Sequence, residues 1–444
     1  MTSVKIYFLK LFLFCTENLV FDHIGYFFFK IILSLTITKN RNKNQPKLFW
    51  GPVPILNNKY WSNSLNNNFY TKTIMDDVFH INSKNDFDLY SWDILNQITG
   101  WPSAIKFRYR NFFLTYYIIK HFDIFHIPFS GAFLGNTRFW KKEPLLWKRY
   151  NKKIVVIPYG SDAYMYSRIK DESFQNSLLI SYPELAKNEA AITEKVRFWE
   201  QHADFLNGGF IIDGMARWDV PIGNYVVVDT NKVAPCDHYS EADGVNGAVI
   251  IAHSPNHRGV KGTEFLIEAV ERLKMEGLKI ELILIENRKN SEVLEILHSK
   301  TDILVEQLIF GYGLSAIEGM SSGVAVVSNL SLECYTRPFR RYSYLNECPI
   351  LSATPESIKQ NLKILVRNPE LRMILGQAGR KYVEKYHSES FAKFLFSKVY
   401  DKIWYNKEVD LMSMFHPLNP DSYNNKSPKI DHPLIENKLP SIYL

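Results

Sequence analysis

Cysteine is scarce in this 444-residue chain, which contains four cysteines and no C-x-x-C pair. These four, Cys15, Cys236, Cys334 and Cys348, are too sparse for a disulfide scaffold, so the sequence predicts a reducing, cytoplasmic environment. No cluster of cysteine and histidine has the ligand spacing of a structural zinc site. No Asp-x-Asp pair lies in a suitable metal-binding loop either, and we expect no metal.

Long hydrophobic runs are also missing, although residues 4–37 are rich in Phe, Leu and Ile. Charged residues interrupt this segment at Lys5, Lys10, Glu17, Asp22 and Lys30. A simple transmembrane helix needs about 18 or more uninterrupted apolar residues, and a signal peptide needs a small-residue cleavage site. Two interpretations remain, namely a helical hairpin buried against the first domain and an interfacial membrane anchor. The basic residues that flank and follow the segment favour the anchor.

Charge of one sign is weak, with 53 basic and 46 acidic residues and a net charge of +7. A dedicated nucleic-acid-binding protein would be more basic and would carry a motif, and the chain has no zinc-finger spacing, RNP motif or basic-leucine heptads. Residues 1–47 hold seven basic and two acidic residues, so most of the excess lies there. The charge therefore indicates an anionic membrane surface as partner and no nucleic acid.

Short apolar runs alternate with helix-like segments from Lys47 onward. In the second half, strands are predicted at 248–254, 279–286, 302–309 and 323–329, with helices at 262–277, 290–300 and 314–322. In the first half, FDIFHIPFSG (122–131), KKIVVIPYGSDAY (152–164) and GNYVVVD (223–229) read as further strands. Strands that alternate with helices form parallel sheets in doubly wound α/β domains. We expect two such domains with a cleft between them.

The segment HSPNHRGVKGT (253–263) follows a predicted strand and begins a predicted helix. Ligands of open α/β sheets bind at the carboxyl ends of the strands, and a helix N-terminus offers free amides to an anion. Arg258 adds a guanidinium fork and Lys261 a mobile point charge, while Gly259 and Gly262 allow close backbone approach. The pattern predicts a phosphate site, with a solvated basic turn as the alternative.

The segment FGYGLSAIEGMSSG (310–323) also joins a predicted strand to a helix. Its G-x-G-x-x-A core, formed by Gly311, Gly313 and Ala316, has the local context of a dinucleotide fingerprint, which is a weak signal by itself. It could equally hold the phosphates of a nucleotide sugar. Glu318 could then accept hydrogen bonds from ribose hydroxyls, or it could only interact with the helix dipole.

These segments resemble retaining glycosyltransferases with the GT-B fold, of the family 4 or "glycosyl transferases group 1" type. The resemblance covers about residues 48–404 and is carried most strongly by HSPNHRGVKGTEFLIEA (253–269), TDILVEQLIFGYGLSAIEGMSSGVAVV (301–327) and YVEKYHSESFAKFLFSKVYDKIW (382–404). The first half resembles the same enzymes more moderately, at GPVPILNNKYWSNSL (51–65), FDIFHIPFSG and KKIVVIPYGSD. The resemblance implies two Rossmann-like domains that face a central cleft, with the last helix crossing back to the first domain.

On this basis we expect five parts in the chain. They are an apolar, basic N-terminal segment (1–47), an acceptor domain (48–225), a donor domain (226–385), a crossover helix (386–404) and a tail (405–444). The tail contains Asn, Pro and Ser with little periodicity, so we expect it to be loosely ordered.

The resemblance implies that the second domain holds a nucleotide-sugar donor. By motif position, Arg258 and Lys261 would hold the diphosphate, and Lys261 would also be catalytic. Glu318 matches the second Glu of the family's Glu, seven residues, Glu motif and would contact ribose. The loop before it would bind the donor through Gly311, Tyr312, Gly313 and Leu314.

Two features of the second half depart from the family pattern. The first Glu of the motif, which touches the donor sugar in the family, falls on Phe310 here, and Glu306 or Gln307 could substitute only at a different spacing. The separation of Arg258 and Lys261 is also shorter than the commonest form.

In the first domain, the resemblance points to three residues. Gly51 begins the loop expected to pass near the donor phosphates. His126 lies in a D-x-x-H pattern and is a candidate catalytic contact to sugar or acceptor, with a buried, satisfied histidine as the alternative. Asp162, in Gly160-Ser161-Asp162, is a candidate catalytic carboxylate at the acceptor site. Relatives often have histidine where this chain has Pro128 and Tyr159.

The implied reaction moves a sugar from a nucleotide diphosphate sugar to a hydroxyl of a glycan or lipid-linked glycan, with retention at the anomeric carbon. The family needs no metal and no cofactor besides the donor. The implied setting is the assembly of a bacterial surface polysaccharide (capsule, O-antigen or exopolysaccharide), in the cytoplasm or peripherally at the inner face of the membrane. The alternatives are a weak or inactive partner subunit, a GT-B epimerase or phosphorylase, and an NAD-dependent oxidoreductase.

Overall fold

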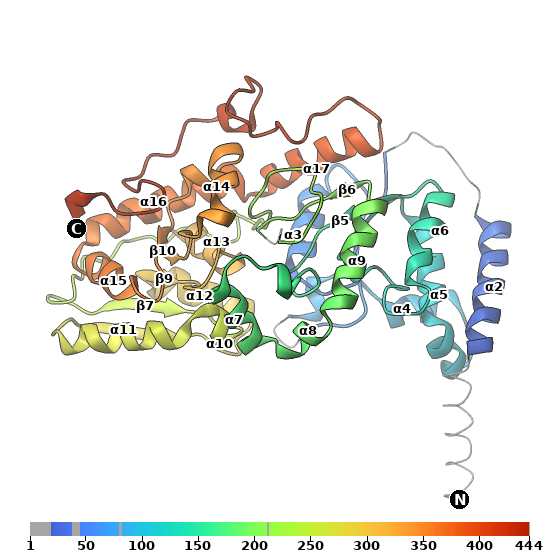
Figure 1. The fold of residues 1–444 in the computed structure, drawn as a ribbon, viewed down its shortest axis with the longest axis horizontal. Coiled ribbons are helices and arrows are strands. Elements are labelled where there is room, and N and C mark those ends of the chain that lie inside the picture. The colour runs from blue at the N-terminus through green and yellow to red at the C-terminus, as the bar shows by residue number, and fades with distance from the viewer. Residues whose placement is uncertain (1–18, 38–44, 80–81, 211–212, 444) are drawn as a thin grey trace, which may run out of the picture.

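The computed structural model describes residues 19–37, 45–79, 82–210 and 213–443. Two parallel sheets flanked by helices lie at the two ends of an elongated molecule (Figure 1). The first sheet has the order β3-β2-β1-β4-β5-β6. Its strands are β1 (Leu48–Trp50), β2 (Thr71–Met75), β3 (Leu89–Tyr90), β4 (Ile124–Ile127), β5 (Lys153–Val156) and β6 (Phe205–Leu206). This is the order of two mononucleotide-binding halves that meet between β1 and β4.

The second sheet has the order β11-β10-β9-β7-β8, and all its pairings are parallel. Its strands are β7 (Val249–His253), β8 (Ile280–Leu284), β9 (Ile303–Val305), β10 (Ala325–Ser328) and β11 (Leu351–Ser352). The strand order reverses between β7 and β9, so a crevice for ligands is expected at the carboxyl ends of these two strands. The predicted pair of doubly wound α/β domains is confirmed.

Helices connect the strands in both domains, and several begin at a polar N-cap. Asp171, Asn368 and Ser388 each accept a hydrogen bond from an amide in the first turn of the helix that follows. In the first domain the helices are α3 (Leu56–Leu65), α4 (Ser91–Ile98), α5 (Ser103–His121), α6 (Glu143–Arg149), α7 (Glu172–Ser181), α8 (Pro183–Lys187) and α9 (Glu189–His202). In the second they are α10 (Arg258–Lys261), α11 (Thr263–Met275), α12 (Asn290–Lys300), α13 (Leu314–Ser321), α14 (Glu333–Tyr342), α15 (Ile358–Arg367) and α16 (Pro369–Tyr386).

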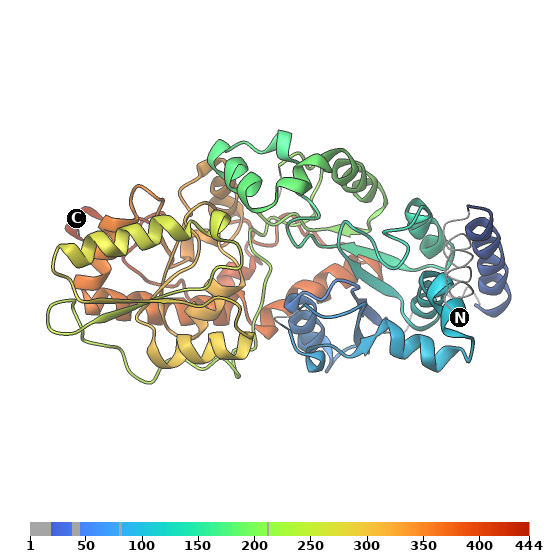
Figure 2. The same ribbon diagram turned by 90° about the horizontal axis from the view of Figure 1, so that it is seen from below.

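The last helix, α17 (Glu389–Ile403), leaves the second domain and packs on α3 of the first (Figure 2). Phe396 of α17 lies edge-on to the ring of Trp50 and packs on Trp61. This contact places the helix where the crossover helix was expected.

The chain passes between the domains at two places that lie side by side. One is the segment 224–228 and the other is the start of α17, and Val228 forms a parallel bridge with Ser388. The strand predicted at 223–229 is therefore wrong, because this backbone bonds to partners outside either sheet: the Val228 amide donates to the carbonyl of His387 at 2.8 Å. We call this place the hinge.

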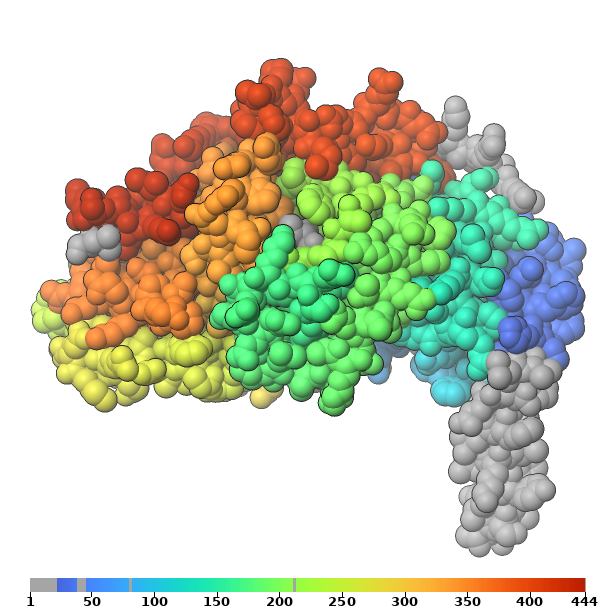
Figure 3. Space-filling view, viewed as in Figure 1, coloured from blue at the N-terminus to red at the C-terminus, as the bar shows by residue number. Residues whose placement is uncertain are grey.

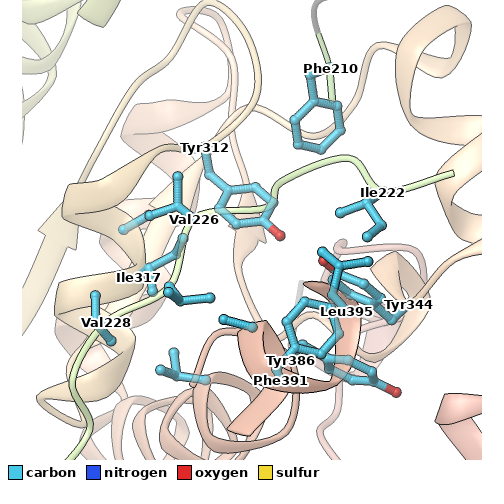
Figure 4. Close-up of a cluster of buried hydrophobic side chains, with 14 of the residues drawn as sticks. Phe210, Ile222, Val226, Val228, Tyr312, Ile317, Tyr344, Tyr386, Phe391 and Leu395 are labelled. Atoms are coloured by element: carbon cyan, nitrogen blue, oxygen red, sulfur yellow. The ribbon is translucent and has the colours of Figure 1, made fainter. Parts of the chain in front are cut away.

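A hydrophobic core continues across the hinge from one domain to the other (Figure 4). Phe210, Ile222, Val226 and Val228 surround it from the chain that leaves the first domain, and Tyr312 and Ile317 from the second domain. The remaining labelled side chains, Tyr344, Tyr386, Phe391 and Leu395, close it from below. The two domains thus share one continuous apolar contact in this closed arrangement.

The C-terminal tail corrects the expectation of loose order, because residues 405–443 follow the surface of the second domain (Figure 3). Asn437 donates through its Nδ2 to the carbonyls of Cys348 and Ile350, and Lys385 donates to those of Ser427 and Pro428. Six apolar tail side chains are buried: Leu411, Met414, Phe415, Ile430, Leu434 and Leu439. These residues are spaced irregularly and fill separate sites, so they leave no periodic signal in the sequence.

Helix α2 (Leu19–Thr36) packs against α5 at the edge of the first domain. Phe29 and Leu33 are buried, and Asp22 pairs with Arg108 and, at 3.1 Å, with Arg138. The outward face carries exposed apolar side chains: Ile24, Phe27, Phe28, Ile31, Ile32 and Leu35. Among the described residues, no helix combines the length and hydrophobicity needed to cross a bilayer. The rest of the predicted N-terminal segment, residues 1–18 and 38–44, lies outside the described residues.

Candidate functional site

The loops after β7 and β9 bring the two predicted phosphate-binding segments together at the switch point of the second sheet. After β7 the chain forms the short helix α10, which contains Arg258 and Lys261. After β9 it turns through Gly311 and Gly313 into α13. The Leu308 amide also donates a hydrogen bond to the Lys261 carbonyl at 3.1 Å, which ties the second loop to the first. The topology therefore builds one site from residues about 50 positions apart, as expected for an open α/β sheet.

Lys261 does not point freely into the crevice, because its ammonium pairs with the carboxylate of Glu306. Glu306 is almost fully buried, with 1% of its surface exposed, and it also accepts hydrogen bonds from Gly313, Ser315 and Ser328. From the sequence, Glu306 is only a possible substitute for the motif carboxylate that Phe310 replaces. Its link to Lys261 spans 45 positions, so local spacing could not reveal it.

Arg258 lies on the exposed side of the same helix. Its guanidinium donates to Glu264 at 2.7 Å and to Glu286 at 2.9 Å. These two bonds, with the charges of both carboxylates, raise the pKa of Arg258 above its ordinary value. The two predicted phosphate ligands therefore lie on one helix. Arg258 pairs with Glu264 and Glu286, and Lys261 pairs with Glu306.

Glu318 lies within α13, is 1% exposed, and accepts a hydrogen bond from the Asn290 side chain at 2.8 Å. Burial raises its pKa to about 7, against the opposing effect of the Asn290 bond. Tyr60 of α3 faces this carboxylate from the first domain: burial, followed by the charge of Glu318, raises the pKa of Tyr60 well above its ordinary value. Glu318 is therefore a buried carboxylate close enough to the first domain to act on Tyr60.

Phe310, at the position of the first motif carboxylate, is buried in an aromatic cluster. Its ring centroid lies 4.8 Å from that of Phe174 and 4.5 Å from that of Tyr335. Phe174 belongs to α7 of the first domain, so the cluster joins the two domains over the second switch point. Phe210 lies 5.7 Å away and completes it. An apolar side chain at 310 thus stabilises the contact between the two domains.

In the loop 311–314, the amides of Gly311 and Gly313 donate to groups within the second domain, and the side chain of Tyr312 points toward the hinge. The ring of Tyr312 is buried toward the hinge. Its hydroxyl lies 3.3 Å from the hydroxyl of Tyr382 and 3.3 Å from Nε2 of His387. Gly311 has a φ of 74°, which favours glycine, and its amide donates to the Asn329 carbonyl at 2.8 Å. The Gly313 amide donates to Glu306, and Leu314 begins α13.

Gly51 and His126 lie together at the switch point of the first sheet, between β1 and β4. A side chain at Gly51, whose φ is 151°, would approach the carbonyl oxygen of Ile74 to 2.2 Å, so only glycine fits this turn. A narrow pocket opens beside it. The residues that line it are Trp50, Val53, Ile55, Asn58, Trp61, His126, Ile127, Pro128, Ile157 and Tyr159.

Both ring nitrogens of His126 are engaged. Nδ1 lies 3.0 Å from the Phe49 carbonyl, which can only accept, so Nδ1 carries the proton. Nε2 lies 2.9 Å from the Tyr400 hydroxyl of α17 and accepts from it, because burial lowers the pKa of His126 to about 3 and keeps the ring neutral. The ring also stacks on Trp50. This arrangement makes His126 a link between the first domain and the crossover helix.

Asp162 organises two loops at the same edge of the first sheet. Its carboxylate accepts amide hydrogen bonds from Phe129 at 2.9 Å, Tyr159 at 2.9 Å and Gly160 at 3.1 Å. Burial raises its pKa to about 6, although these amide bonds act in the opposite direction. The structure therefore gives Asp162 a clear positioning role in the loops that line the first-domain pocket.

The domains also touch directly over α10. The Ser181 hydroxyl at the end of α7 accepts a hydrogen bond from the Val260 amide at 3.1 Å, and α7 packs along α10 (Figure 1). Tyr335 of α14 donates to Asp213, a residue of the first-domain side. These contacts between distant segments had no signal in the sequence.

No family model matches the chain, and no curated protein matches it. Among solved structures, an α-glucosyltransferase in complex with UDP and a mismatched 13-mer DNA is 14% identical over 79% of this chain and 98% of its own, with a TM-score of 0.46. An S. aureus MnaA–UDP structure is 14% identical, covering 81% and 97%, with a TM-score of 0.43. The C-terminal domain of LpcC, a glycosyl transferase group 1 family protein from Francisella tularensis, is 18% identical, covering 36% and 98%, with a TM-score of 0.28. The fold assignment here follows from the strand orders described above.

Proposed function

We propose that this protein is a glycosyltransferase that uses a nucleotide diphosphate sugar and transfers its sugar to a hydroxyl acceptor. The observation that carries the proposal is that two Rossmann-like sheets, each with a switch point, contact one another through Phe174 of the first domain and Phe310 of the second. The second-domain side holds Arg258, Lys261, the N-terminus of α13 and Glu318. The first-domain side holds the aromatic pocket beside Gly51 and His126. One side suits a nucleoside diphosphate and the other a sugar acceptor.

Sugar transfer leaves negative charge on the departing diphosphate. In the proposed reaction, Arg258, Lys261 and the amides at the start of α13 stabilise this charge as preorganised electrostatics. Glu318 binds the ribose hydroxyls, and its burial makes that contact strong because water does not compete. Asp162 and His126 shape the acceptor side. Retention at the anomeric carbon and a role in bacterial surface polysaccharide assembly belong to the same proposal and rest on the motif resemblance.

The proposal is tested by titrating the protein with a panel of nucleotide sugars and following turnover by product analysis. Glu318→Gln keeps the size of the side chain and removes its charge, and we expect it to weaken nucleotide binding by about tenfold or more because it loses a charged hydrogen-bond acceptor. Glu268→Gln, at an exposed position of α11, is the matched control and should bind normally. Equal binding by both variants, or failure of every nucleotide sugar to bind, would remove the site assignment.

An inactive partner subunit is the second candidate, and Phe310 favours it. The aromatic cluster of Phe310, Phe174 and Tyr335 occupies the place where relatives present a carboxylate to the donor sugar. Such a subunit would bind a nucleotide without turning it over. Turnover with a released sugar product would exclude it, and a product that stays on the nucleotide would indicate an epimerase instead.

We further propose that the outward face of α2 contacts a membrane surface. Its six exposed apolar side chains form one face, opposite the buried Phe29 and Leu33. Lys30 on the same helix adds a positive charge that suits anionic lipid. This position would bring the acceptor domain close to a lipid-linked glycan.

A further inference from the structure

The side-chain carboxylate of Glu306 is surrounded by hydrogen-bond donors at the switch point of the second sheet. Its Oε1 pairs with the Lys261 ammonium and accepts from the Ser315 hydroxyl at 3.1 Å. Its Oε2 accepts from the Gly313 amide at 3.3 Å and from the Ser328 hydroxyl at 3.3 Å. One cation, one amide at the N-terminus of α13 and two hydroxyls therefore surround a single buried carboxylate.

Three of these four donors are the groups that a diphosphate would need at this place. A lysine ammonium binds phosphate oxygens as a point charge, and the first amide of a helix offers them a free hydrogen. Ser315 lies in the first turn of α13 and adds a hydroxyl beside that amide. A phosphate oxygen and the Glu306 carboxylate would compete for the same hydrogens.

The charge balance around the two cations points in the same direction. Arg258 pairs with Glu264 and Glu286, and Lys261 pairs with Glu306, so two cations face three carboxylates. Side chains of Glu264 and Glu286 are 64% and 37% exposed, and water and salt screen their charges. Glu306 is buried, so its charge acts on an incoming anion with little screening.

We propose that Glu306 is an internal competitor of the donor diphosphate. It neutralises Lys261 and occupies the Gly313 amide at the start of α13, and a diphosphate that binds there displaces it from both donors. The proposal rests on the function proposed above and adds a consequence to it. Because the carboxylate returns to the same donors after the reaction, it favours release of the nucleoside diphosphate product.

Calorimetric titration with inorganic pyrophosphate tests the competition directly. Glu306→Gln removes the negative charge and keeps the shape of the side chain, and we expect its Kd for pyrophosphate to be about tenfold lower than that of the unaltered protein, or lower still, because an unscreened charge next to the ligand is gone. Glu286→Gln is the matched control. It makes the same change in net charge at an exposed partner of Arg258, so its Kd should change by less than about threefold.

Equal or weaker pyrophosphate binding by Glu306→Gln would overturn the proposal and leave Glu306 as a residue that only positions Lys261. Lack of pyrophosphate binding in every protein tested would overturn it as well. Glu306→Met, of similar length and without charge, carries the same expectation if the Gln variant does not fold. Failure of the proposed glycosyltransferase function gives a different pattern: pyrophosphate binding keeps the expected ranking, while no nucleotide sugar is turned over.

Discussion

Replacement of Lys261 by Met should destabilise the second domain, because it leaves the buried carboxylate of Glu306 without its cation. Breaking a buried ion pair by removing one partner costs about 3–5 kcal/mol. Ser315, Ser328 and Gly313 still donate to Glu306, so we place the loss near the lower end, at about 3 kcal/mol. For a domain of this size each kcal/mol lowers the Tm by about 2–4 °C, which predicts a fall of about 6–12 °C.

Differential scanning calorimetry of Lys261→Met, Glu306→Gln and the double variant would measure this loss. The double variant should recover most of the lost stability, since it buries no unpaired charge, and the cycle gives the coupling energy of the pair. A Tm for Lys261→Met within about 1 °C of the unaltered protein would refute the reasoning, as would a double variant no more stable than Lys261→Met.

Four further outcomes are expected. Nucleoside diphosphate affinity should fall from pH 8 to pH 6, because Glu318, with a pKa raised by burial to about 7, gains a proton; calorimetry should find no such dependence for Glu318→Gln. The raised pKa of Glu318 should also lower folding stability as the pH rises from about 4.5 to about 7, because in this range the unfolded chain has released a proton that the folded chain keeps. Denaturant titrations across this pH range would show the loss. Phe27→Ser with Phe28→Ser should reduce flotation with anionic vesicles by about tenfold or more while the Tm stays constant, since both side chains are exposed; retained flotation would contradict the membrane contact. Phe415→Ala should cost about 3–5 kcal/mol of unfolding free energy in denaturant titration, whereas Met412→Ala in the same tail should cost less than about 0.5, because only the first is buried.

Local patterns in the sequence were sufficient for the elements that carry the site. The helix α12 begins and ends at the predicted residues, and β7 and β9 fall within the predicted strands. Strand–turn–helix signals of this kind depend on residues within about ten positions of one another, so a single sequence contains them. The parallel sheets followed from the alternation of these elements.

The partners of the site residues could not be predicted in the same way. Lys261 meets Glu306 across 45 positions, and His126 meets Tyr400 across 274, so only the folded chain brings them together. In the sequence, Phe310 is notable only because it replaces a carboxylate of the motif. Its packing against Phe174 depends on how the two domains lie against each other. Tertiary contacts decide these roles, and no periodicity records them.

The two segments that connect the domains are bridged to each other at Val228 and Ser388. This bridge fixes a pivot for any rotation of one domain away from the other. A rigid rotation displaces each atom in proportion to its distance from the axis, so the core around Tyr312 would move little. The contact of α7 with α10 lies on the side of the molecule away from α17 (Figure 1) and would travel farthest. A small angular change at the pivot is therefore amplified into a wide separation at α10, and it would draw Phe174 of α7 away from Phe310 of the second domain.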